Sequence, residues 1–170
     1  MNTKKISLIM IAVLFSVISV FSQEAENNTT KLSTNYLGLH AGFTTGLGLS
    51  FRHWSDKYGV QITAIPIKTD NVQFISASLT GLYSIRNEKY YRHFLYLGNH
   101  LLINQTETYY DYNGNYKEEQ KTSYNAGFGY GFEVGKKVRF NLMVGYAGYN
   151  LLETDFSLLP TAEMGLYFEL

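Results

Sequence analysis

The chain has 170 residues, a formal net charge of zero and no cysteine. This length fits one domain, and the lack of cysteine excludes disulfides and thiol chemistry. The zero net charge gives no indication of a nucleic-acid partner. Tyrosine and glycine each occur 15 times, beside 11 phenylalanines. This composition favours interface belts and tight interior packing over the core of a soluble enzyme.

The N-terminus reads as a cleaved signal peptide over residues 1–22. Lys4 and Lys5 give a positive start, residues 6–21 are apolar apart from three serines, and Ser22 is a small residue suited to cleavage. The alternative is a membrane-anchoring helix, although a span needs about 20 apolar residues. Residues 23–34 are mostly polar and predict a flexible leader, so that 35–170 form the folded domain.

Eight segments then alternate between an apolar face and a face of small or polar residues, as strands do when they separate two environments. Their approximate ranges are 35–43, 47–54, 58–67, 74–85, 93–104, 124–134, 138–147 and 159–170. Pro66 is expected to end the regular pairing of the third segment. Asn99 falls on the apolar face of the fifth segment, so a bulge or a shift of parity at this position stays an alternative.

The segment 124–134 decides the fold class. Its even positions are apolar or aromatic, whereas Gly127, Gly129 and Gly131 occupy the other face. Strands usually avoid glycine, but a glycine face suits a cramped barrel interior whose outer face meets lipid. An 11-residue strand is about 36 Å long, and when tilted by about 45° it spans roughly 25 Å, the height of the apolar band of such barrels.

In lipid, strands must close into a barrel to satisfy their backbone groups. We therefore predict an all-β fold, a closed antiparallel up-and-down transmembrane β-barrel of about eight strands. A barrel of this size has an interior filled by side chains.

The last six residues carry a resemblance to a known family. They read Gly165-Leu166-Tyr167-Phe168-Glu169-Leu170, which resembles the C-terminal assembly signal of Gram-negative outer-membrane β-barrels, with Leu170 where phenylalanine is commoner. The architecture is similar to the small eight-stranded barrels of the OmpA/OmpX type, without a periplasmic domain. The resemblance implies outer-membrane lipid around the barrel, termini facing the periplasm, and recognition of Gly165, Phe168 and Leu170 by the barrel assembly machinery.

Several polar side chains have interior parity and predict a polar network in the lumen: His40, Arg52, Glu133, Arg139, Glu163 and Glu169. The small residues around them are expected to leave room for these long side chains. A buried arginine that loses its partner costs about 3–5 kcal/mol, so Arg139 should pair with Glu133 or Glu163. We interpret the network as a structural plug. A gate or narrow pore is the alternative.

Neither a cofactor nor catalysis is expected. His40 and His100 have interior parity but lie on opposite walls, and a metal site needs three or four converging ligands. No serine and histidine share a strand at a suitable spacing near Glu163, so no triad is evident.

Two groups of aromatic residues lie toward the strand ends. The tyrosine-rich loop 105–122 is a candidate surface-partner site, and the alternative is a solvated loop with strand extensions. An aromatic girdle is predicted at the inner-turn side, formed by Trp54, Tyr58, Tyr83, Tyr90 and Tyr91.

The pattern favours an exported outer-membrane barrel with a structural or surface-interaction role. The alternative is an exported soluble barrel that binds a small apolar ligand, as lipocalins do. Such a binder needs bulky apolar side chains inside and a solvated outer face. Here the second face is rich in glycine, serine and threonine, and most charges fall in turns and loops.

Overall fold

The structure is a computed structural model that describes residues 33–68, 72–110, 116–153 and 156–170. The predicted signal peptide, residues 1–22, lies outside the described residues. So does the predicted leader, except that residues 33 and 34 already belong to the first strand. Within the described part of the chain, no helix is long and apolar enough to cross a membrane.

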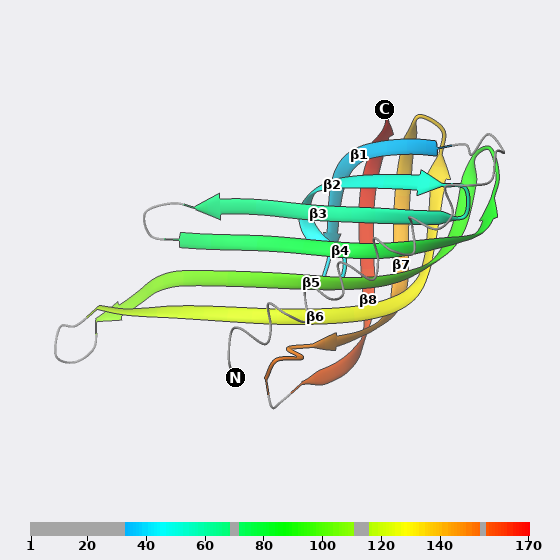
Figure 1. Cartoon of the computed structure of the whole chain (residues 1–170). Helices are drawn as coiled ribbons and strands as arrows, with labels where there is room; N and C mark the ends of the chain where they lie inside the picture. Colours follow the sequence, from blue (N-terminus) through cyan, green and yellow to red (C-terminus); the bar gives the residue numbers. More distant parts are fainter. Residues whose placement is uncertain (1–32, 69–71, 111–115, 154–155) are drawn as a thin grey trace, which may run out of the picture. The chain divides into compact units, whose positions relative to one another are not determined.

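Eight antiparallel strands close into a barrel (Figure 1). They are β1 (Ser33–Gly42), β2 (Gly46–Ser55), β3 (Tyr58–Lys68), β4 (Val72–Asn87), β5 (Tyr91–Tyr110), β6 (Tyr116–Gly135), β7 (Val138–Tyr149) and β8 (Ser157–Glu169). Each strand pairs with the next in sequence, and β1 pairs with β8, for example Leu39 with Leu166. The predicted fold class is confirmed.

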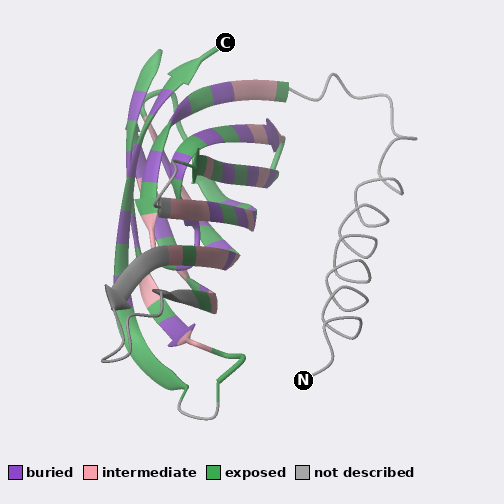
Figure 2. Ribbon diagram, turned by 90° about the vertical axis from the view of Figure 1, so that its left-hand side faces the viewer, coloured by how far each residue is buried: buried purple, intermediate pink, exposed green. Residues whose placement is uncertain are grey.

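Burial alternates along the strands, as the stripes in Figure 2 show. The outward side chains of Leu39, Leu97 and Phe128 are 61%, 68% and 60% exposed, whereas inward Arg52 and Gln61 are fully buried. The barrel therefore has an apolar outer face and a polar interior, which is the reverse of a water-soluble barrel.

The two ends of the barrel differ. At one end lie Ser33, Glu169 and the short turns 56–57, 88–90 and 136–137; we call this the short-turn end. At the opposite end, which we call the hairpin end, β5 and β6 continue as strands of 20 residues each. By contrast, the strands β1 and β2 have only 10 residues each.

The predicted loop 105–122 is mostly paired strand. Gln105 pairs with Gln120 and Glu107 with Glu118, and residues 111–115 lie outside the described part. The strand extensions that the alternative allowed are therefore present, and only the prediction of a continuous loop over 105–122 was wrong, because it relied on apolar alternation. Backbone hydrogen bonds between strands need no apolar side chains, so the ladder continues where the alternation stops.

Two local predictions are also corrected. Pro66 does not end β3: it pairs with Ile75, and β3 continues to Lys68. Beyond Ala64, β3 has no described pairing with β2, and proline is tolerated on such an edge. Asn99 keeps its register with Leu79 and Ala126, and the irregularity in this part of the sheet lies between Ser84 and Arg86 instead.

The glycines of β6 make room for rings and for a turn. A Cβ at Gly131 would lie 2.2 Å from the Phe94 ring, and one at Gly129 would lie 2.8 Å from the Tyr96 ring. A Cβ at Gly127 would lie 2.7 Å from Thr44 Cγ2. The small residues were expected to leave room for the long charged side chains. For the β6 glycines this was wrong, because the side chains that they leave room for are those of Phe94, Tyr96 and Thr44.

We expect Gly131→Ala to lower the free energy of unfolding by about 1–3 kcal/mol, because the new methyl group overpacks the Phe94 ring. Urea titration of the refolded barrel in lipid vesicles measures this change. Gly81→Ala is the matched control, since a Cβ there would meet only the Leu97 carbonyl oxygen at 3.9 Å. Equal losses in the two variants would contradict the packing argument.

Candidate functional site

The lumen holds two clusters of polar side chains. The turn cluster consists of Glu163, His40 and Thr161 around Thr44 and Thr45. The arginine cluster consists of Arg52, Arg92 and Arg139 around Glu133. Because the interior faces of all eight strands converge there, we take the lumen as the candidate site.

The turn between β1 and β2 folds into the lumen. Thr44 and Thr45 are fully buried, and Gly46 and Gly48 have positive φ angles of 85° and 134°. These are left-handed conformations that glycine adopts without strain. Both glycines lie at the start of β2, before its first pairing with β3 at Leu49 and Ala64.

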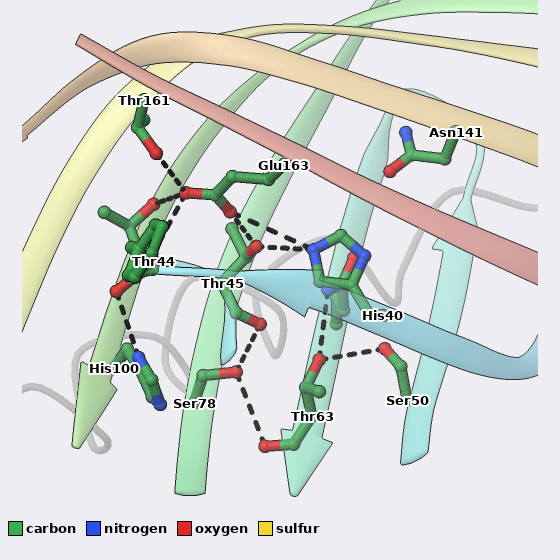
Figure 3. A network of polar contacts seen from close by, with 12 residues as sticks. His40, Thr44, Thr45, Ser50, Thr63, Ser78, His100, Asn141, Thr161 and Glu163 are labelled. Carbon is green, nitrogen blue, oxygen red and sulfur yellow. Dashed lines mark hydrogen bonds and ion pairs between the residues drawn. The ribbon is translucent and has the colours of Figure 1, made fainter. Parts of the chain in front are cut away.

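Glu163 of β8 holds this turn (Figure 3). Its Oε1 accepts hydrogen bonds from the Thr44 backbone N at 3.1 Å, from the Thr44 hydroxyl and from the Thr161 hydroxyl at 3.2 Å. Its Oε2 accepts from the Thr45 hydroxyl and lies 3.9 Å from His40 Nε2. A buried carboxylate with this many donors is well satisfied.

The turn is also tied to three other strands. His100 Nδ1 of β5 lies 3.0 Å from the Phe43 carbonyl oxygen, and Asn125 Nδ2 of β6 donates to the same oxygen at 3.1 Å. The Ser78 hydroxyl of β4 donates to the Thr45 carbonyl oxygen at 2.6 Å. The turn is thus held by hydrogen bonds to β4, β5, β6 and β8.

Glu133 stands at the centre of the arginine cluster. Arg52 Nη1 lies 2.8 Å from its Oε2, and Arg92 Nη1 and Arg139 Nη1 lie 3.3 Å and 3.2 Å from its Oε1. Arg52 also donates to Gln61 Oε1, from Nε at 3.1 Å and from Nη2 at 2.5 Å. The predicted carboxylate partner of Arg139 is therefore Glu133.

Aromatic rings pack against these guanidinium groups. Arg52 Cζ is 4.1 Å from the centroid of the Tyr167 ring, and Arg92 Cζ is 4.2 Å from that of Trp54. Such cation–π contacts contribute about 0.5–2 kcal/mol each. Trp54 is 1% exposed, so its predicted place in the aromatic girdle on the outward face was wrong. Its parity is that of Arg52, which turns both side chains inward.

The two clusters form one network through the lumen. Hydrogen bonds connect, in order, Thr45, His40, Tyr167, Ser50, Thr63, Gln61 and Arg52. Links of 2.5–3.1 Å join these side chains. Since Thr45 binds Glu163 and Arg52 binds Glu133, this series of hydrogen bonds joins one cluster to the other.

The structure brings most of the predicted lumen residues inside. Arg52, Glu133 and Arg139 are in one cluster, and His40 and Glu163 are in the other. Glu169 is exposed at the end of β8.

Three members of the clusters, Arg92, Thr44 and Thr45, were not found from the sequence. Arg92 lies just before the predicted segment 93–104, although it shares the parity of Phe94 and Tyr96. Nothing in the alternation indicated that Thr44 and Thr45, in a turn, would be buried.

A serine–histidine pair also lies in the lumen. Ser76 Oγ is 2.9 Å from His100 Nε2, the distance of a hydroxyl from its base. Ser76 is fully buried and its hydroxyl accepts the Leu47 backbone N–H at 3.0 Å. The pair therefore supports the inserted turn. Among the described residues, no group of three or more His, Cys, Asp or Glu could hold a metal ion.

Comparison with solved structures finds small outer-membrane barrels. The N-terminal β-barrel domain of Pseudomonas aeruginosa OprF is 15% identical, with 81% of this chain and 96% of that domain covered and a TM-score of 0.49. The attachment invasion locus protein Ail of Yersinia pestis is 16% identical, with 81% and 97% covered and a TM-score of 0.43. Neisserial surface protein A is 12% identical, with 81% and 93% covered and a TM-score of 0.34.

The architecture of this chain itself is a closed antiparallel β-barrel of eight strands. Likenesses at this level concern the fold alone and say nothing of a shared activity. No protein-family profile and no curated protein matches the sequence.

We expect Glu163→Ala to release the turn, because Thr44 and Thr45 lose their acceptor. The variant should unfold at a lower urea concentration, because each buried donor left without an acceptor costs about 1–3 kcal/mol, and it should raise the conductance of single barrels in planar bilayers. Glu169→Ala, on the same strand and face but exposed, is the control. If both variants kept the wild-type conductance and stability, Glu163 would not hold the turn.

Proposed function

We propose that the chain is an integral outer-membrane protein with a closed lumen and a structural or surface-interaction role. The observation that carries this proposal is the reversed polarity of the barrel. Large apolar side chains such as Leu97 and Phe128 face outward, while Arg52 and Glu133 are buried inside. A bilayer satisfies such an outer face, and the pairing of β1 with β8 closes the sheet, as strands in lipid require.

The same polarity disfavours the lipocalin-like alternative. A soluble barrel that binds an apolar ligand needs an apolar cavity, yet this lumen contains two charged clusters and an inserted turn. The turn cluster also supports a plugged lumen over a narrow pore, because Thr44 and Thr45 fill the space between four strands. Neither catalysis nor a cofactor is part of the proposal.

Export and insertion complete the proposal. Residues 1–22 would serve as a cleaved signal peptide, and the last strand would be read by the barrel assembly machinery. Phe168 is 51% and Leu170 73% exposed on the outward face or end of β8, where another protein could contact them. Gly165 faces inward, and a Cβ there would lie 2.6 Å from His40 Nδ1. The short-turn end would face the periplasm.

We expect the mature protein to fractionate with the outer membrane and to migrate faster on a gel when it is not boiled, because the closed barrel resists detergent. Leu97→Arg should lower the yield of the folded band, since an arginine at the lipid face costs about 2–4 kcal/mol. Asp56→Arg, in a short turn outside the apolar band, is the control. Recovery of wild-type protein in the soluble fraction would contradict the proposal.

We infer that the β5–β6 hairpin carries the surface interaction. A strand of 20 residues is about 66 Å long. When tilted by about 45°, it rises about 47 Å, roughly 20 Å more than the apolar band. The projecting part includes the polar pairs of Gln105 with Gln120 and Glu107 with Glu118. Its tyrosines and charges are residue types that suit a protein partner.

Replacement of residues 106–119 by a two-residue turn should leave insertion and the heat-dependent gel shift unchanged, because β5 and β6 pair fully below that level. Adhesion of cells that display the barrel to protein-coated surfaces should fall to the level of cells without it. Lys89→Ala, in the turn 88–90 at the short-turn end, is the control and should adhere as the wild type does. Unchanged adhesion of the shortened hairpin would refute the inference.

A further inference from the structure

The arginine cluster contains more positive charge than its one carboxylate can neutralise. Three guanidinium groups, of Arg52, Arg92 and Arg139, surround Glu133, and their side chains are 1%, 5% and 8% exposed. Arginine does not lose its proton in proteins. Across the residues that the structure describes, the ion pairs of these three arginines all go to Glu133. Two positive charges are therefore left over.

The cluster also has donors without acceptors. Arg92 Nη1 and Arg139 Nε are buried and have no hydrogen-bond partner, although Arg92 Nη1 lies within 3.3 Å of Glu133 Oε1. The indole Nε1 of Trp54, whose ring lies against Arg92, is buried without a partner too. Buried donors are normally satisfied. Several unsatisfied donors beside an excess of charge indicate a missing acceptor that is negatively charged.

The unsatisfied donors lie near the short-turn end. Arg92 is the second residue of β5 and Arg139 the second residue of β7, so each is one position from a short turn. Their side-chain exposures of 5% and 8% are small but exceed the 1% exposure of Arg52 and Glu133. A ligand would thus reach Arg92 and Arg139 first, from this end.

We propose that Arg92 and Arg139 bind a phosphate group at the short-turn end of the lumen. A guanidinium fork matches an oxyanion in shape and charge, and the several oxygens of one phosphate can accept from both arginines at once. The negative charge offsets the excess that Glu133 leaves. Inorganic phosphate and the phosphate of a lipid headgroup share this chemistry. The site lies inside the barrel, so the inference does not depend on the proposed surface role.

The test uses the full barrel refolded in a zwitterionic detergent that contains no phosphate. Calorimetric titration with inorganic phosphate at constant ionic strength should show one saturable site. Arg139→Gln should weaken binding at least about tenfold, equal to about 1.4 kcal/mol. Arg86→Gln is the matched control: Arg86 is near the same end, but its side chain is 62% exposed and pairs with Glu88 at 3.2 Å. It should bind as the wild type does.

Two further arms keep the test decisive. Glu133→Gln removes the competing carboxylate and should tighten phosphate binding. If a variant fails to fold, the melting temperature of the wild type decides: phosphate should raise it more than chloride at equal ionic strength.

Titration with dihexanoyl phosphatidic acid separates the sources of the phosphate group. Binding of the lipid alone assigns the site to a headgroup, and binding of inorganic phosphate assigns it to the free ion. No saturable binding of either probe, or equal binding by Arg139→Gln and Arg86→Gln, would overturn the proposal.

Discussion

The insertion of the β1–β2 turn into the lumen is the constraint on which much of the interior depends. Glu163 accepts its backbone and hydroxyl donors, and Gly127 and Gly98 leave the space that it occupies. His100 and Asn125 then bind the Phe43 carbonyl oxygen that the turn carries inside. A longer side chain on β5 or β6 at this level would expel the turn, and several buried groups would lose their partners together.

The interior of an eight-stranded barrel is filled by side chains, so the polar groups of its lumen must be satisfied largely by one another. The network from Thr45 through Tyr167 to Arg52 does this over most of the interior. Aromatic rings fill what the polar side chains leave, as Phe94 does above Gly131. Polar satisfaction and close packing are therefore achieved by the same inward faces, which explains why these faces combine glycine, hydroxyl and aromatic residues.

The alternation of side chains was sufficient to predict the closed barrel and the inward position of Arg52, Glu133, Arg139 and Glu163. It was not sufficient where the determining contact is between distant strands. The burial of Thr44 depends on Glu163, which is 119 positions away, and no local pattern reports such a contact. The pairing of 105–110 with 116–120 was not predicted for another reason. Polar strands outside the apolar band do not alternate between apolar and polar residues, so the sequence pattern does not indicate them.

The two clusters differ in their balance of hydrogen-bond donors and acceptors, and this difference indicates where a ligand could bind. At Glu163 one carboxylate is surrounded by neutral donors from the turn and from Thr161, so its acceptor capacity is used. At Glu133 the donors outnumber the acceptors, and the outermost of them keep slight exposure. A closed, saturated cluster has nothing left to offer a ligand. The end of the lumen with surplus donors and surplus charge is where an added acceptor would stabilise the fold.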